Sequence, residues 1–322
     1  MPDSAIDTPE IITVGRISVD LYPTTEGPMR DVRTLEKSVG GTATNVAVAA
    51  ARLGRRAALV TKVGDDAFGD DVTHALSSRF NVDTRWVSTH PTLKTPLAFA
   101  ELNPRTEPNI IFYREPSGPD MELQPSELED LPVRECGILW MPATRFSSEP
   151  SRSTVTGLLK RRGRAEHTIL DLDWRFQFWA SEEAAHAVIN PMLGHFSVII
   201  GNRDECRVAV GTSDPNQAAD RLLETGATCA VVKLGGDGVM VATADGQRET
   251  VAPYPVEVVC GLGAGDAFGG SFCDSLLSGV GFVEAARRGN AAGAIVAARL
   301  LCADDMPYRH EVDQVRTDGA VL

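Results

Sequence analysis

The chain has 322 residues, of which 43% are hydrophobic and 23% are charged, as is ordinary for a globular protein. Its 31 Lys and Arg residues face 44 Asp and Glu residues, and the net charge of −13 argues against nucleic acid or an anionic membrane as a partner. The length fits two domains or one large α/β domain with an appendage.

The first ten residues are acidic and polar and lack the pattern of a signal peptide. No apolar run approaches the roughly 18 residues of a membrane span. The six cysteines are scattered and form no C-x-x-C pair, which favours a reducing compartment. We therefore expect a cytoplasmic protein.

Short apolar runs alternate with helical patterns along most of the chain. The predicted strands cover residues 11–14, 57–60, 138–141, 168–172, 198–200, 229–232 and 256–259. The predicted helices cover residues 44–53, 67–79, 151–160, 182–192, 217–224 and 267–277. This alternation predicts an α/β fold in which a mostly parallel sheet has helices on both faces.

Two segments interrupt the alternation, at about residues 21–38 and 94–121. Both contain short strand patterns separated by Pro and Gly. They either pair into one small sheet that covers the site as a lid, or form unrelated surface hairpins. A paired sheet would have exposed edges, and these could join two copies of the chain into a homodimer through the lid.

The strongest motif is the glycine-rich segment 261–268, between the last predicted strand and the last predicted helix. Backbone N–H groups of Gly263, Ala264 and Gly265 at a helix N-terminus would form an anion hole. Asp266 is then either a base, which the helix end keeps ionised at neutral pH, or only a helix cap. The spacing matches neither a Rossmann dinucleotide site nor a P-loop.

Polar residues near the N-terminal end of the chain suggest contacts with a polar ligand. Gly41 precedes a predicted helix, and the amide of Asn45 lies one turn into it, although Thr42 or Thr44 could simply cap this helix. Asp20 follows the first strand, where a carboxylate can accept hydrogen bonds from a sugar diol.

Two further strand ends carry candidate groups. Asn202 and Glu205 either hold Mg²⁺ through oxygen ligands and water or merely begin a helix. The loop that contains Lys233, Gly235, Gly236 and Gly238 is either a backbone-rich approach to a nucleotide or an ordinary hairpin turn.

In this order, the motifs resemble the ribokinase-like sugar kinases of the phosphofructokinase-B type, from about residue 11 to about residue 306. The resemblance implies one kinase domain over residues 1–322, built as a three-layer α/β/α sandwich with a small β lid. It also implies ATP and Mg²⁺ as cofactors and a small-molecule sugar as partner. The roles it implies are a general base at Asp266, transition-state stabilisation by Gly263, Ala264 and Gly265, sugar binding by Asp20, Gly41 and Asn45, magnesium at Asn202 and Glu205, and nucleotide binding by Lys233, Gly235, Gly236, Gly238 and Asn290.

Residues 14–22, 112–115, 171–175 and 302–307 are similar to the 5-dehydro-2-deoxygluconokinases of myo-inositol breakdown, which phosphorylate the terminal hydroxyl of 5-dehydro-2-deoxy-D-gluconate. This resemblance implies a sugar acid as substrate. Arg16, Arg114 and Arg175 are candidates for its carboxylate, because a planar guanidinium suits bidentate binding.

Two alternatives stay open: a kinase of 2-keto-3-deoxygluconate or fructose, and a regulator of this fold that binds sugar or nucleotide without catalysis. One departure from the family concerns Cys260, Gly261 and Leu262. Many relatives have Asp and Thr there, and these help to build a monovalent-cation site. The departure puts potassium activation in question.

Overall fold

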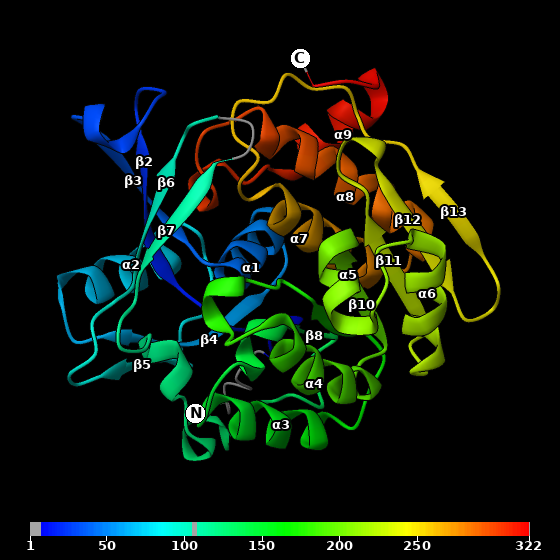
Figure 1. The fold of residues 1–322 in the computed structure, drawn as a ribbon, viewed down its shortest axis with the longest axis horizontal. Coiled ribbons are helices and arrows are strands. Elements are labelled where there is room, and N and C mark those ends of the chain that lie inside the picture. Colours follow the sequence, from blue (N-terminus) through cyan, green and yellow to red (C-terminus); the bar gives the residue numbers. More distant parts are fainter. Residues whose placement is uncertain (1–7, 105–107, 322) are drawn as a thin grey trace, which may run out of the picture.

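The computed structural model describes residues 8–104 and 108–321. Residues 1–7, on which much of the signal-peptide prediction rests, lie outside the described part, as do residues 105–107 within the second predicted lid segment. A nine-stranded sheet runs between two layers of helices, and a smaller sheet stands at one side (Figure 1). None of the helices in the described part combines the length and apolarity that a membrane span requires.

The large sheet is parallel except at one edge. From that edge its strands are β13 (Arg248–Val251), β12 (Val239–Thr243), β11 (Cys229–Lys233), β10 (Val198–Asn202), β9 (Thr168–Asp171), β8 (Ile138–Pro142), β1 (Ile11–Val14), β4 (Ala57–Gly64) and β5 (Val87–His90). Only the β11–β12 and β12–β13 pairs are antiparallel. The parallel strands therefore end at the same edge, where the candidate site residues follow them.

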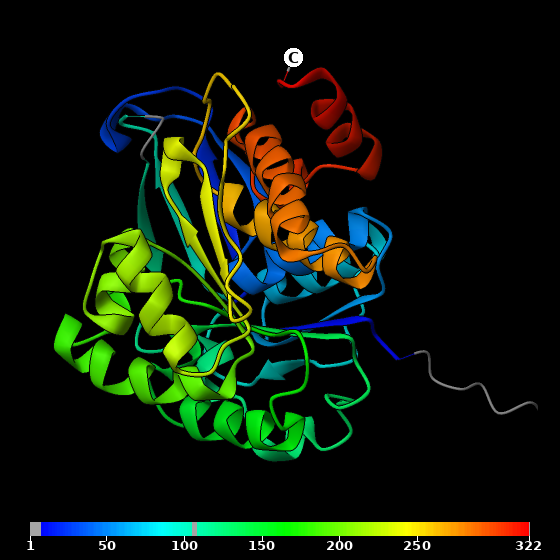
Figure 2. The same ribbon diagram turned by 90° about the vertical axis from the view of Figure 1, so that its right-hand side faces the viewer.

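Each face of the large sheet packs against its own group of helices (Figure 2). One group is α1 (Thr42–Arg52), α2 (Ala67–Ser78), α7 (Ala264–Leu277), α8 (Phe282–Ala297) and α9 (Arg309–Asp318). The other is α3 (Ser151–Arg162), α4 (Glu182–Met192), α5 (Arg203–Val210) and α6 (Pro215–Glu224). Ile11 belongs to the first core and Ile12 to the second, because successive side chains of a strand point to opposite faces. The α/β fold with helices on both sides is thus confirmed.

The strand predicted over residues 256–259 does not form, and this prediction was wrong. The segment has no regular secondary structure and belongs to neither sheet. Pro253 and Pro255 lack backbone donors just before it. The N–H groups of Val259 and Cys260 instead donate to the carbonyl of Ala297, at 2.8 and 3.1 Å, so helix α8 takes the place of a neighbouring strand.

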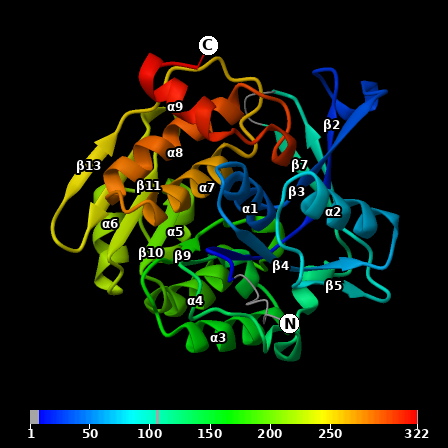
Figure 3. The ribbon, with the colours of Figure 1, turned by 180° about the vertical axis from the view of Figure 1, so that it is seen from behind.

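The two segments that interrupt the alternation pair into one four-stranded sheet, in the order β3 (Leu35–Gly40), β2 (Ser18–Pro23), β6 (Leu97–Glu101) and β7 (Asn109–Tyr113). Strands β2 and β6 are parallel, and the other two pairs are antiparallel. The sheet projects from the side of the molecule, as Figure 3 shows from behind. Because β2 follows β1 closely, Asp20 lies near the carboxyl end of the large sheet.

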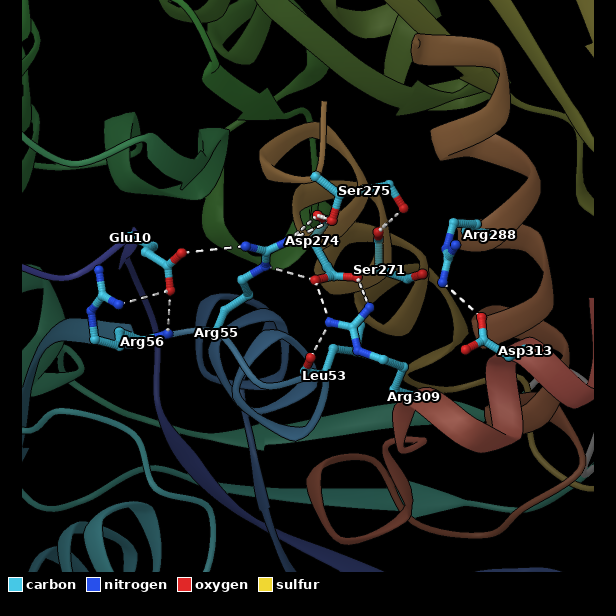
Figure 4. A network of polar contacts seen from close by, with 11 residues as sticks. Glu10, Leu53, Arg55, Arg56, Ser271, Asp274, Ser275, Arg288, Arg309 and Asp313 are labelled. Carbon is cyan, nitrogen blue, oxygen red and sulfur yellow. Dashed lines mark hydrogen bonds and ion pairs between the residues drawn. The ribbon is translucent and has the colours of Figure 1, made fainter. Parts of the chain in front are cut away.

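A buried carboxylate joins the helices on one face. Asp274 of α7 is 1% exposed and accepts hydrogen bonds from Arg55 and Arg309 (Figure 4). Arg55 follows α1, and Arg309 begins α9. Arg309 also donates to the carbonyl of Leu53. This network joins α7 and the segment after α1 to α9, and the first turns of α1 and α7 border the candidate site.

Candidate active site

The glycine-rich segment forms the first turn of helix α7. Gly263 is its N-cap residue, with φ of 80°, and a Cβ atom there would lie 2.8 Å from the Cys302 sulfur. Both the conformation and the space therefore require glycine. The N–H groups of the first helical residues have no acceptor within the helix. They point out of its N-terminal end, where they can stabilise an anion.

Asp266 occupies the first turn but accepts a hydrogen bond from a different helix. The Nδ2 atom of Asn45 in α1 donates to its Oδ2 atom at 2.7 Å. The Gly263 cap makes no side-chain bond. The carboxylate of Asp266 thus points toward the space between α1 and α7 and lines a pocket there.

Burial raises the pKa of Asp266 to about 7. The hydrogen bond from Asn45 lowers this pKa, whereas the charges of Asp171 and Asp173 raise it further. The prediction that the helix end would keep Asp266 ionised at neutral pH is therefore corrected: the loss of water on burial raises the pKa of this carboxylate into the neutral range.

The pocket around Asp266 is bordered by both sheets. Its polar lining includes Asp20 from β2, Gly41 and Asn45 from the start of α1, and Arg16 and Arg175 from loops after β1 and β9. The structure thus brings together five of the six residues predicted to bind the sugar. The four-stranded sheet also contributes Ala98, Ala100, Ile110 and Phe112, so it covers one side of the pocket.

The start of α1 has a backbone conformation that only glycine adopts readily. Gly41 is the N-cap residue with φ of 104°. The alternative that Thr42 or Thr44 caps the helix is wrong: Thr42 donates to Asp173 at 3.0 Å, and Thr44 donates to the carbonyl of Arg16 at 2.9 Å. Neither contact was visible in the sequence, because each joins separate segments of the chain.

Two groups in the pocket have hydrogen-bonding capacity for a ligand. The Oδ1 atom of Asn45 is buried and has no hydrogen-bond partner. Asp20 accepts from the Ser18 hydroxyl at 2.6 Å and from the Tyr22 hydroxyl at 3.4 Å, while burial raises its pKa. A buried acceptor without a donor is costly, so a sugar hydroxyl that donates to Asn45 would gain binding energy.

The three candidate arginines have different surroundings. Arg175 donates from Nε to Asp173 at 2.9 Å, and its pKa is raised by that carboxylate. Arg16 donates to Thr42 at 2.8 Å. Arg114 is paired with Asp120 at 3.1 Å and lines a neighbouring cavity rather than the pocket of Asp266. Arg16 lines both the pocket of Asp266 and this cavity, so the structure separates Arg114 from Arg175 but not from Arg16.

On the other side of the α7 first turn lies a second cavity of about 640 Å³. Its lining includes all the residues predicted to bind nucleotide, namely Lys233, Gly235, Gly236, Gly238 and Asn290, together with Ala264 and Gly265. The loop after Lys233 is the hairpin between β11 and β12, as one of the two interpretations expected, and it also borders this cavity. Apolar groups such as Tyr254, Val256 and Phe268 complete the walls, and volume and lining suit a nucleotide.

Asn202 and Glu205 form a reciprocal helix cap. Glu205 donates its N–H to Asn202 Oδ1 at 2.9 Å, and Asn202 donates its N–H to Glu205 Oε2 at 2.7 Å. The helix-start interpretation therefore describes these contacts. Within residues 8–104 and 108–321, no group of three or more His, Cys, Asp or Glu side chains is placed to hold a metal directly.

Asp171 is a buried acid that sequence reasoning did not select for a role. It ends β9, is 3% exposed, and its Oδ1 atom lies 3.5 Å from the Lys233 ammonium. Burial raises the pKa values of both Asp171 and Glu205. The sequence did contain a signal for Asp171: it lies at the carboxyl end of a buried strand, next to the strand that ends at Asn202.

The loop before the anion hole is packed with apolar groups. Cys260 is fully buried in a cluster with Tyr22, Leu301 and Cys302, against which Leu262 packs. Burial raises the pKa of Cys302 well above its usual range. Cys260, Gly261 and Leu262 offer no side-chain oxygen that could bind a monovalent cation.

An anion hole between a nucleotide-sized cavity and a polar pocket, with a carboxylate in its first turn, defines a phosphotransferase that acts on a small hydroxylated molecule. The chain belongs to the pfkB family of carbohydrate kinases, whose family model matches residues 8–309. This confirms the resemblance found in the sequence.

Several known proteins are similar over nearly the whole chain. A 5-dehydro-2-deoxygluconokinase of Bacillus anthracis is 32% identical over 311 residues, covering 94% of this chain and 93% of that protein. The crystal structure of a Vibrio cholerae fructokinase with fructose, ADP and calcium has a TM-score of 0.84 at 24% identity and covers 96% of this chain and 99% of that one. An E. coli protein in complex with ATP and Mg²⁺ has a TM-score of 0.86 at 22% identity, with coverage of 96% and 99%. The two structures share the fold.

Proposed function

We propose that the protein transfers the γ-phosphoryl group of ATP to the terminal hydroxyl of a sugar acid, with 5-dehydro-2-deoxy-D-gluconate as the first candidate. The observation that carries the proposal is Asp266, which lines the polar pocket from the first turn of α7, beside the backbone N–H groups at the start of that helix. The name of the Bacillus anthracis relative supports the choice of sugar acid.

In the proposed reaction, Asp266 accepts the proton of the terminal hydroxyl. The hydroxyl oxygen then forms its bond to the γ-phosphorus, and the bond to the β,γ-bridging oxygen breaks, so that ADP leaves. The N–H groups of Gly263, Ala264, Gly265 and Asp266 would stabilise the charge that develops on the phosphoryl oxygens. Asp20, Gly41 and Asn45 would orient the sugar, with Asn45 Oδ1 accepting from a hydroxyl.

ATP would occupy the cavity lined by Lys233, the hairpin glycines and Asn290. Asn290 donates to the carbonyls of Val251 and Ala252 at 3.3 and 3.0 Å, so it would shape the cavity wall. Asn202 and Glu205 would hold Mg²⁺ through water, since their nearest atoms are engaged in the helix cap; a magnesium ion would neutralise phosphate charge during transfer. The absence of a side-chain oxygen at residues 260–262 supports activity without potassium.

An assay of ADP release tests the function directly. We expect ADP to form with 5-dehydro-2-deoxy-D-gluconate and Mg²⁺, and much more slowly with 2-keto-3-deoxygluconate, with fructose or without a sugar. A preference for fructose would contradict the proposed substrate but would still support a sugar kinase. No ADP with any sugar would favour the non-catalytic regulator. Potassium, sodium and a large organic cation are compared in the same assay.

The substrate carboxylate is proposed to bind Arg175, whose Nε is held by Asp173 while its guanidinium lines the pocket. We expect Arg175→Ala to raise KM for the acid by about 10- to 150-fold, as loss of a hydrogen bond between charged groups implies. A neutral analogue with a reduced carboxyl group should lose far less. Equal losses for both ligands would remove Arg175 from this role.

Arg114→Ala is the matched control for that measurement. Arg114 contacts Asp120, which keeps a second partner in Arg145 at 2.8 Å. We expect a smaller change in KM for the acid than in Arg175→Ala. A larger change would place the carboxylate at Arg114 and the neighbouring cavity instead.

A homodimer through the four-stranded sheet is also proposed. Strands β3 and β7 form its edges, and Tyr113 at the end of β7 is 63% exposed. Pairing with a second copy would cover an edge. We expect light scattering to give a dimer mass at micromolar concentration, and substitution of Ile111 by Pro in β7 to shift it toward the monomer. A wild-type monomer mass that does not change with concentration would contradict this.

A further inference from the structure

The side chain of Lys233 reaches the first turn of helix α7. Lys233 is the last residue of β11, and it lines the nucleotide-sized cavity together with Ala264 and Gly265. A Cβ atom placed on Gly265 would lie 3.6 Å from the Lys233 Nζ atom, which is ordinary van der Waals contact. The ammonium therefore stands beside the backbone N–H groups of the anion hole.

The two carboxylates near this ammonium hold it loosely. Its Nζ atom is 3.5 Å from Asp171 Oδ1 and 4.0 Å from Glu205 Oε2. Both distances exceed the roughly 2.7–2.9 Å of a charge-assisted hydrogen bond. The Asp171 Oδ1 atom is buried without a hydrogen-bond partner. The ion pair therefore leaves hydrogen-bonding capacity unused on both Asp171 and Lys233.

The Lys233 ammonium can therefore bind a further anion. An ammonium has three donors, and the side chain is 22% exposed, which leaves it accessible from the cavity. A positive group next to an anion hole strengthens the site where a phosphoryl group carries its charge.

We infer that the Lys233 ammonium is a catalytic group that contacts the γ-phosphoryl group during transfer, and that Asp171 and Glu205 hold it in place before ATP binds. This rests on the proposed function, since it requires ATP in the cavity. The Lys233 side chain thus has a role of its own, in addition to the nucleotide binding proposed for the backbone of the β11–β12 hairpin. ADP lacks the γ-phosphoryl group, so the contact distinguishes the two nucleotides.

Titration calorimetry without sugar tests the contact, because ATP is then not consumed by transfer. We expect Lys233→Met to weaken ATP binding by about 10- to 150-fold, the range for a hydrogen bond between charged groups. ADP binding should stay close to that of the wild type. Equal weakening of ATP and ADP would overturn the inference alone. A wild-type protein that binds neither nucleotide would overturn the proposed function, and the inference with it.

A second variant separates phosphate binding from charge neutralisation. If Lys233 only neutralised Asp171, then Lys233→Met/Asp171→Asn, which removes both charges, would recover wild-type affinity for ATP. We expect instead that the double variant still binds ATP weakly relative to ADP. It also keeps the test valid if Lys233→Met alone leaves its buried acids unpaired and fails to fold. Recovery of the wild-type preference for ATP would overturn the inference.

Discussion

Asp266→Asn is expected to lower kcat by about 10²- to 10⁴-fold, the usual contribution of a positioned general base. An amide has nearly the size of a carboxylate, and its oxygen can still accept the hydrogen bond that Asn45 donates at 2.7 Å. The fold and the binding of sugar and nucleotide should therefore persist. Steady-state kinetics and a thermal melt, measured on the same preparation, separate loss of the base from loss of structure.

The pH dependence gives an independent check on the same residue. Burial raises the pKa of Asp266 to about 7, and only the ionised form can accept a proton. The wild-type kcat/KM should therefore rise with pH through about 7 and level off above it, whereas Asp266→Asn should lose this step. A variant that melts like the wild type and turns over within about threefold of it would refute the assignment of the base, since the expected loss is at least about a hundredfold.

Much of the fold could be predicted because its signals are local. The apolar runs that became β1, β8 and β10 are short, flanked by turn residues and buried on both faces, which is the pattern of a parallel sheet. The run over residues 256–259 has a similar composition, yet it forms no strand. Whether a neighbouring strand is available is a property of the tertiary fold, and no local pattern contains it.

In the candidate site, too, local features could be predicted from the sequence and long-range ones could not. The glycine-rich segment predicted the start of the helix that carries Asp266, because a turn and a helix start are readable from adjacent residues. The raised pKa of Asp266 could not be read from the sequence, since it depends on burial and on Asp171 and Asp173, which lie at the end of β9 and in the loop after it. Arg114 was grouped with Arg175 on chemistry alone, but the structure pairs it with Asp120. Residue types predict which chemistry a site can perform, while long-range contacts decide which of the candidate residues lie in that site.

Asp274→Ala is expected to reduce the free energy of unfolding by about 3 kcal/mol, the lower part of the range for removing one partner of a buried ion pair. The Asp274 side chain is 2% exposed, and Arg55, at 17%, would be left without its main acceptor. Arg309 is 43% exposed and can turn toward water, which places the expected cost at the lower end. Urea unfolding of both proteins at neutral pH measures the difference.

Asp313→Ala is the control, because it also removes an aspartate that pairs with an arginine on this face. Figure 4 shows Asp313 paired with Arg288. The two charged groups are 2.7 Å apart, but the Asp313 side chain is 49% exposed, so its loss should cost less than about 1 kcal/mol. Asp274 lies far along α7 from its first turn, and folded Asp274→Ala protein should keep the wild-type kcat. Equal stability losses in the two variants would show that the burial of Asp274 does not set the strength of this network.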